Sequence, residues 1–176
     1  SKSRDTPNTD LGKLIHIKKL IENKDYKESR KFLEEITFDH ALYLFFKYQI
    51  IILENKSKII PRELKINPNE LKKDTDFFIK YDDGFDITNN LKQKFFVLIG
   101  NHYFSKKKYG AAIILYQLCL KVNSGNIDAL TGIANCYQSL GLNSLAEKHY
   151  VQITSFYTWA RPDFAENTDI ISESDE

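Results

Sequence analysis

The side chains most able to do chemistry in this chain are its four histidines and two cysteines. His102 and Cys136 invite a metal or thiol interpretation. Both fall at the same position of an internal repeat, however, and an unpaired cysteine in a protein is usually a small buried hydrophobe. His16, His40 and His149 have no metal-ligand spacing with one another. We therefore interpret His102 and Cys136 as packing residues and expect no metal site.

Sequence motifs of catalysis are absent as well. The chain contains no glycine-rich phosphate loop, no nucleophile elbow, no HExxH and no CxxC. An enzyme would also need a cluster of titratable residues in a pocket, and the sequence pattern indicates none. We expect a protein that is not an enzyme and that needs no cofactor.

The charge balance limits the partners of the chain. Lys and Arg number 25 against 24 Asp and Glu, so the net charge of +1 creates no field that would attract a polyanion. The lysine runs at 106–108 and 72–73 lack regularly interleaved aromatic residues, so we interpret them as solvated surface and expect no nucleic-acid binding. The densest apolar stretch, Tyr48 to Leu53, is too short for a membrane span. With only two cysteines and no disulfide framework, we expect an intracellular location, cytoplasmic or nuclear.

The spacing of apolar residues predicts a mainly helical chain. Two stripes of helical period, at 14–21 and 26–36, predict a helix and a second helix that folds back on it. The segment 41–53 is apolar nearly all round; Ile and aromatic residues make a strand the alternative, but the length favours a buried helix. From 56 to 90 the pattern weakens, and we expect an irregular insert in which Asn69 caps a short helix through about Lys80.

The C-terminal half contains an internal repeat. The segment 96–103 aligns with the segment 130–137. The same offset produces three pairs further on: Ala112 with Ala146, Tyr116 with Tyr150, and Cys119 with Ile153. Gly100 and Ala134 supply a small residue on the first helix of each unit, opposite the paired alanines, where a bulky side chain would push the two helices apart. This pattern resembles the tetratricopeptide repeat, a helix-turn-helix unit of about 34 residues.

The resemblance implies an all-α fold in which tetratricopeptide-like helical hairpins stack into a short right-handed superhelix. The expected organisation is a flexible tail at 1–10, a helical domain at 11–160 and an acidic tail at 161–176, the domain comprising degenerate hairpins at 11–55, the insert at 56–90 and two clear repeats at 93–156. The chain departs from the family pattern at two places. Lys107 occupies the turn position held by Gly141 in the next repeat, and Ser124 stands where the family has a proline.

In this family the first helix of each repeat lines a concave groove, which implies where a partner would bind. The positions that would face the groove are Lys94, Val97, Asn101 and Phe104 in the first clear repeat and Asp128, Thr131, Asn135 and Gln138 in the second. The amides of Asn101 and Asn135 offer both donors and acceptors to the backbone of an extended peptide. Members that dock on chaperones clamp a C-terminal carboxylate with a basic residue four positions before this asparagine. Val97 and Thr131 occupy those positions here, which disfavours such a ligand.

Two functions follow from the resemblance. The first is a non-catalytic scaffold or adaptor subunit of a larger assembly, which binds a protein or peptide segment through its groove or flank. A weaker similarity to the tetratricopeptide scaffold subunits of the anaphase-promoting complex, over about residues 18–135, supports this function. The alternative is a small tetratricopeptide chaperone that cradles an apolar client segment. Self-association through an uncapped end of the repeat array also remains open.

Overall fold

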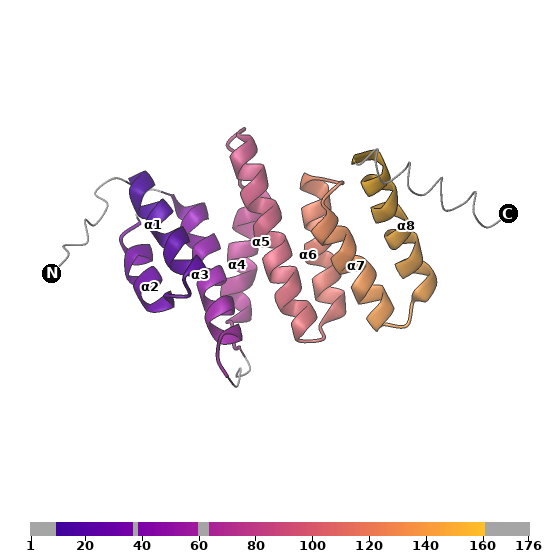
Figure 1. Cartoon of the computed structure of the whole chain (residues 1–176), viewed down its shortest axis with the longest axis horizontal. Helices are drawn as coiled ribbons and strands as arrows, with labels where there is room; N and C mark the ends of the chain where they lie inside the picture. Colours follow the sequence, from indigo (N-terminus) through magenta and orange to yellow (C-terminus); the bar gives the residue numbers. More distant parts are fainter. Residues whose placement is uncertain (1–9, 37–38, 60–63, 161–176) are drawn as a thin grey trace, which may run out of the picture. The chain divides into compact units, whose positions relative to one another are not determined.

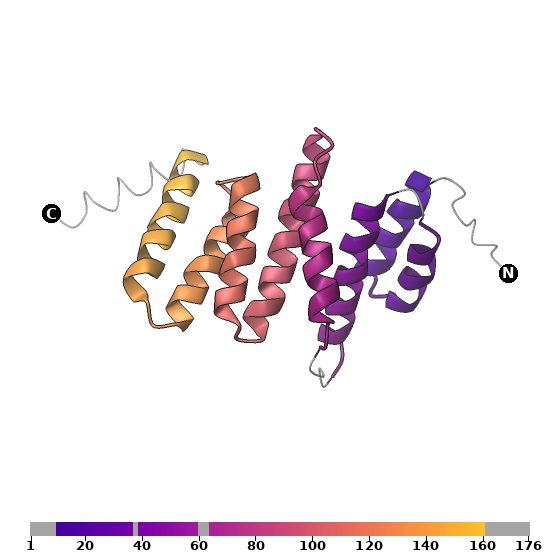
Figure 2. The ribbon, with the colours of Figure 1, turned by 180° about the vertical axis from the view of Figure 1, so that it is seen from behind.

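The computed structural model describes residues 10–36, 39–59 and 64–160, so the predicted tails, apart from Asp10, lie outside the described residues. Within those ranges all regular secondary structure is α-helical, which confirms the all-α fold class. The helices are α1 (Asp10–Glu22), α2 (Tyr26–Glu34), α3 (His40–Lys56), α4 (Pro68–Lys80), α5 (Asp86–Ser105), α6 (Tyr109–Val122), α7 (Ile127–Ser139) and α8 (Asn143–Ala160). The chain divides into two compact units, Ser1–Asp83 with α1 to α4 and Gly84–Glu176 with α5 to α8 (Figures 1 and 2).

In the first unit, α1 and α2 form the helical hairpin that the two apolar stripes predict. The side chain of Asp25 caps α2 by accepting the backbone N–H of Glu28 at 3.3 Å. Buried side chains from α1, α2 and α3, and from the residue Ile36 that follows α2, make one apolar core: Ile17, Ile21, Tyr26, Leu33, Ile36, Phe46 and Ile50. This core holds the hairpin against the third helix.

The helix α3 is the buried helix predicted over 41–53, and the strand alternative is wrong. Its buried side chains are Ala41, Leu44, Phe46, Tyr48, Ile50 and Ile52. These residues lie on two opposite faces of the helix, so α3 must be covered on more than one side. The carboxylate of Asp39 caps its first turn by accepting the N–H of Leu42 at 3.1 Å.

The helix α4 lies within the predicted irregular insert. It ends at Lys80 as expected, but its N-cap is Asn67, whose side chain accepts the N–H of Asn69 at 3.0 Å. Pro68 opens the helix, because a proline in the first turn lacks an N–H that would have no helical partner there. The insert is also shorter than expected, since α5 already begins at Asp86.

In the second unit, four antiparallel helices follow one another. The helix α6 packs against both α5 and α7, α8 packs against α7, and α5 also contacts α7. The α5–α6 and α7–α8 turns lie at one end of this unit and the α6–α7 turn at the other (Figure 1). The first helices of the two predicted repeats, α5 and α7, are therefore neighbours that run in the same direction.

Three hairpin turns share one backbone conformation. Lys24, Lys107 and Gly141 have φ values of 61°, 60° and 76°. The residue that follows each of them donates its N–H to the carbonyl five positions earlier: Asp25 to Leu20 at 2.9 Å, Lys108 to Tyr103 at 2.9 Å and Leu142 to Tyr137 at 2.8 Å. This is the Schellman arrangement that ends a helix with one left-handed residue. The lysine at position 107 therefore adopts the conformation that glycine provides in the next hairpin.

This geometry predicts that Lys107→Gly stabilises the protein. A residue with a Cβ pays about 1–2 kcal/mol in the left-handed region, which exceeds the extra chain entropy that glycine loses on folding. We expect the free energy of unfolding to rise by about 0.5–1 kcal/mol, measured by urea denaturation. Lys106→Gly is the matched control, because Lys106 has a φ of −86° and glycine gains nothing there. Equal effects of the two substitutions would contradict the prediction.

Candidate functional site

The predicted binding residues lie on α5 and α7 and remain accessible. Lys94 and Asn101 on α5 are exposed, as are Asp128 and Gln138 on α7. Val97, Phe104, Thr131 and Asn135 are half-buried. On each helix the residues follow one another at helical spacing, so each set forms one stripe. We call these residues together the α5/α7 face.

A tyrosine from the second helix of each hairpin holds each asparagine of this face. The hydroxyl of Tyr116 on α6 donates to Oδ1 of Asn101 at 2.6 Å, and that of Tyr150 on α8 donates to Oδ1 of Asn135 at 2.7 Å. In both pairs the partners are 15 residues apart. The repeat of the sequence is therefore also a repeat of one specific contact. From the sequence, we expected both the donor and the acceptor group of each amide to be available to a ligand. In the structure, a tyrosine hydroxyl already donates to the acceptor oxygen of each amide.

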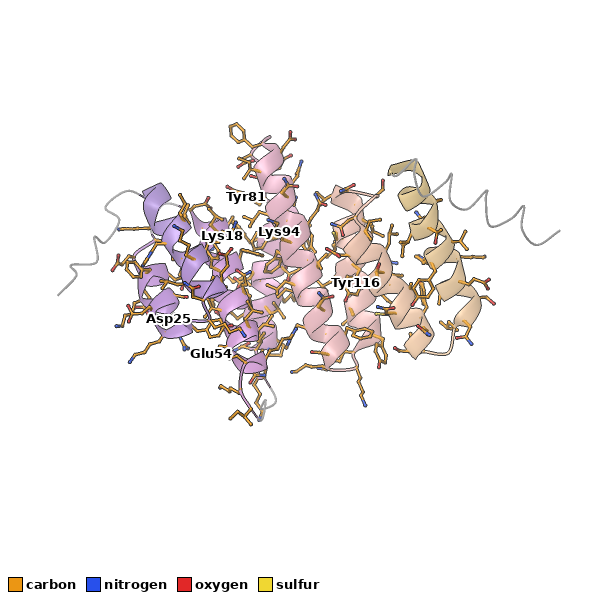
Figure 3. All side chains as sticks on the ribbon, in the orientation of Figure 1. Lys18, Asp25, Glu54, Tyr81, Lys94 and Tyr116 are labelled. Carbon is orange, nitrogen blue, oxygen red and sulfur yellow. The ribbon has the colours of Figure 1, made fainter. Side chains whose placement is uncertain are left out.

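The ring of Tyr116 fills the space between two glycines. Figure 3 labels Tyr116 in the second unit. The residue is 1% exposed. A Cβ placed on Gly100 of α5 would lie 2.6 Å from its ring, and one placed on Gly132 of α7 would lie 2.4 Å from it. The small residue at position 100 thus makes room for an aromatic ring, whereas we expected it to allow close contact with Ala112. Ala112 is itself fully buried.

Sequence reasoning missed Gly132. The offset between the two repeats pairs it with Leu98, so it has no counterpart in the other repeat. The sequence nevertheless offers one indication. Gly132 lies in the interior of a predicted helix, where a glycine usually has a packing reason. That reason is the ring of Tyr116, which arrives from the preceding hairpin.

The two thiols lie inside the second unit. Cys119 and Cys136 are both 0% exposed, and burial raises the pKa of Cys119 to about 12 and that of Cys136 to about 11. His102 is also buried and contacts the ring of Tyr103. In the part of the chain that the structure describes, no group of three or more His, Cys, Asp or Glu side chains could hold a metal ion. Burial of these residues agrees with their interpretation as packing residues.

Because both thiols are buried, we predict that the protein loses stability at alkaline pH. An unfolded thiol loses its proton near pH 8.5, but the folded protein retains both protons to higher pH, so the free energy of unfolding falls as the pH rises from about 8.5. The expected slope approaches about 1.4 kcal/mol per pH unit for each thiol. Urea denaturation between pH 8 and pH 10 measures it, and the double variant Cys119→Ala, Cys136→Ala should show a shallower slope. Equal slopes would contradict the prediction.

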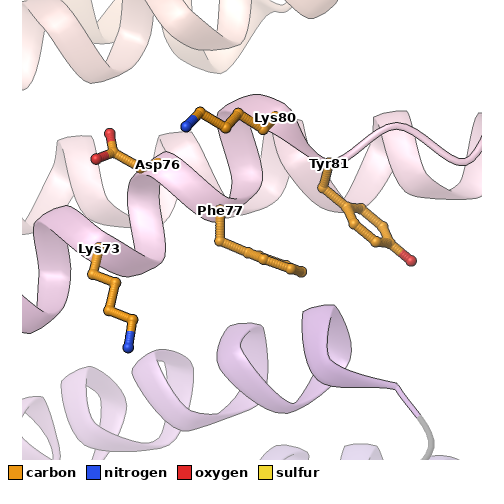
Figure 4. Close-up of a pocket in the computed structure, with 5 residues that line it drawn as sticks. All are labelled: Lys73, Asp76, Phe77, Lys80 and Tyr81. Atoms are coloured by element: carbon orange, nitrogen blue, oxygen red, sulfur yellow. The ribbon is translucent and has the colours of Figure 1, made fainter.

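Figure 4 shows the side chains that line a shallow depression beside α4 in the first unit. The depression has a volume of about 380 Å³. Its lining residues are Lys73, Asp76, Phe77, Lys80 and Tyr81. The rings of Phe77 and Tyr81 stack at 5.1 Å, and burial, followed by the charges of Asp39 and Asp83, raises the pKa of Tyr81. The depression offers aromatic surface flanked by charged groups, which suits contact with a partner. Of these residues, sequence reasoning noted Lys73, as part of a solvated lysine run, and Lys80, as the expected end of the helix.

The first unit also contains a buried polar pair. The hydroxyl of Tyr48 on α3 donates to Oδ2 of Asp74 on α4 at 2.5 Å, and both residues are less than a tenth exposed. An ion pair between Lys47 and Glu70 joins the same two helices at the surface. These contacts fix α4 on α3.

Comparisons with known proteins find no relative of this chain. No family model matches it, and no curated protein or solved structure is significantly similar. Among the described residues, no helix has the length and apolar character needed to cross a membrane. The function of the chain is therefore inferred from its fold and from the α5/α7 face.

Proposed function

We propose that this chain is a non-catalytic protein-interaction module of the tetratricopeptide type, which binds an extended segment of a partner protein through the α5/α7 face. One observation carries the proposal: the Tyr116–Asn101 contact recurs as Tyr150–Asn135 at the equivalent positions of the next hairpin. A recurring contact of this kind is expected when two hairpins are copies of one structural unit, since each repeat then places equivalent residues on the same surface.

The chemistry of the face favours a scaffold or adaptor subunit over a chaperone for apolar clients. Its exposed side chains, those of Lys94, Asn101, Asp128 and Gln138, are all polar. An apolar client would leave such groups without water or hydrogen-bond partners, which is costly. A partner with polar backbone groups satisfies them. We therefore propose a subunit of an intracellular assembly, cytoplasmic or nuclear, with a protein or peptide partner and without nucleic acid.

The test is selection of random dodecapeptides displayed on phage against the whole chain. Thr131→Arg places a long charged side chain on the α5/α7 face, and Ile114→Arg places it on an exposed position of α6 that is 58% accessible. We expect the selected peptides to bind the Ile114→Arg variant as they bind the wild type, and to lose about tenfold or more of their affinity for the Thr131→Arg variant.

Several outcomes of this experiment would contradict the proposal. Failure to enrich any peptide would count against it, as would peptides that bind the Thr131→Arg variant normally. Enrichment of wholly apolar peptides would favour the chaperone alternative. Thermal melting of both variants establishes that each remains folded.

A further inference from the structure

The asparagines of the α5/α7 face have a fixed orientation. An asparagine amide has an acceptor edge at Oδ1 and a donor edge at Nδ2. The Tyr116 hydroxyl holds Oδ1 of Asn101 at 2.6 Å, and because the amide is planar, Nδ2 is turned away from that hydroxyl. Tyr116 is itself held between Gly100 and Gly132, so its hydroxyl has little freedom to follow a rotating amide. The exposed edge of Asn101 is therefore its donor edge.

We propose that Tyr116 and Tyr150 are positioning residues that make Asn101 and Asn135 hydrogen-bond donors toward the partner, so that the partner must present carbonyl oxygens. This inference rests on the proposed function, because it assigns the partner's chemistry at the same face. The backbone of an extended segment supplies carbonyl oxygens at regular intervals without requiring a particular side chain. The partner segment is thus recognised by its backbone at these two positions.

The charges of the face define the partner further. Among its residues, Lys94 is the one cation and Asp128 the one anion. Neither sign predominates. The attraction of a strongly charged segment to one of these two residues would therefore be offset by its repulsion from the other. The partner segment is accordingly an uncharged one, and its affinity should be nearly independent of salt concentration.

The two asparagines are not held equally. The Tyr150 hydroxyl lies 2.7 Å from Oδ1 of Asn135 but also 3.0 Å from Oε1 of Gln138. A hydroxyl has one proton to donate, so the two acceptors compete for it. Tyr116 has no such second acceptor among its described contacts. The pair Tyr116–Asn101 is therefore the better one to test.

Asn101→Asp separates the two edges of the amide. A carboxylate still accepts the hydrogen bond of Tyr116, but it has no N–H to donate. The probes are acetylated and amidated peptides synthesised from the phage selection, measured by isothermal titration calorimetry. We expect about tenfold weaker binding to the Asn101→Asp variant with an unchanged melting temperature. Asn135→Asp is a second variant, used if Asn101→Asp fails to fold, and should weaken binding in the same direction.

Tyr116→Phe tests the positioning role both without a ligand and with the selected peptides. The phenyl ring still fills the space between the glycines, but Asn101 loses the hydroxyl that holds it. Nitrogen-15 relaxation of the side-chain NH2 group should show a rigid amide in the wild type and a mobile one in Tyr116→Phe, together with weaker peptide binding. Tyr103→Phe, on α5, is the matched control. It should leave the mobility of the Asn101 amide and the affinity for the peptides unchanged.

The outcomes distinguish this inference from the proposed function. If Asn101→Asp binds the peptides as the wild type does, the donor assignment is wrong while peptide binding stands. If the Asn101 amide is equally mobile in the wild type and in Tyr116→Phe, the positioning role is wrong. If the wild type enriches no peptide at all, the proposed function and the partner assignment fail together.

Discussion

Gly132→Ala is expected to lower the free energy of unfolding by about 2 kcal/mol, although alanine is the better helix former. The new Cβ would lie 2.4 Å from the Tyr116 ring, and that ring cannot move aside because Gly100 bounds it on the other side. The overlap between the new Cβ and the ring can be relieved only if α6 and α7 move apart. Urea denaturation followed by circular dichroism measures the loss.

A double-mutant cycle tests the cause of that loss. Tyr116→Ala alone should cost about 3–5 kcal/mol, since it removes a fully buried aromatic side chain. In that background the methyl group of Gly132→Ala meets no ring, so it should stabilise the protein by about 0.5–1 kcal/mol through helix propensity. Simple additivity of the two substitutions would show that the ring is not what excludes a side chain at position 132.

Tyr48→Phe is expected to cost about 2–3 kcal/mol, an unusually large loss for the removal of one oxygen atom. The substitution leaves the carboxylate of Asp74 inside the first unit without the hydroxyl that donates to it at 2.5 Å. A buried charged group that loses its donor carries the full cost of its lost hydration. Urea denaturation again provides the measurement, and Tyr43→Phe on the same helix is the control, with little expected change.

A second variant separates this explanation from a packing effect. Replacing both partners with apolar residues, as in Tyr48→Phe with Asp74→Leu, removes the buried charge and should recover most of the stability. A double variant as unstable as Tyr48→Phe alone would assign the loss to the space left by the missing hydroxyl and not to the unpaired carboxylate.

The helical hairpins could be predicted from the sequence because their signals are local. The stripes at 14–21 and 26–36 depend on residues three and four apart, and the structure confirms both helices. The turn at Lys107 was visible as the counterpart of Gly141, and the structure gives both residues a positive φ. The start of α4 was predicted two residues too late, with Asn69 as the cap, because a proline ends or begins a helix according to its position relative to a cap, and Asn67 was not identified as that cap.

The contacts of the α5/α7 face could be predicted only in part. Comparison of repeats finds residues that two units share, such as Asn101 and Asn135, but it says nothing about which side chain reaches them. The hydroxyl of Tyr116 comes from another helix, so its bond depends on how α5 and α6 pack. Gly132 was missed for the same reason, since its contact joins two different hairpins.

The position of Tyr116 also has a consequence for how the second unit melts. Its ring touches the first helix of its own hairpin and the first helix of the next one, so neither hairpin can loosen without disturbing the other. In an array of similar units, such shared side chains set the cooperativity of the whole. A scanning calorimeter should therefore record α5 to α8 as a single transition, and removal of this one ring should split that transition into two.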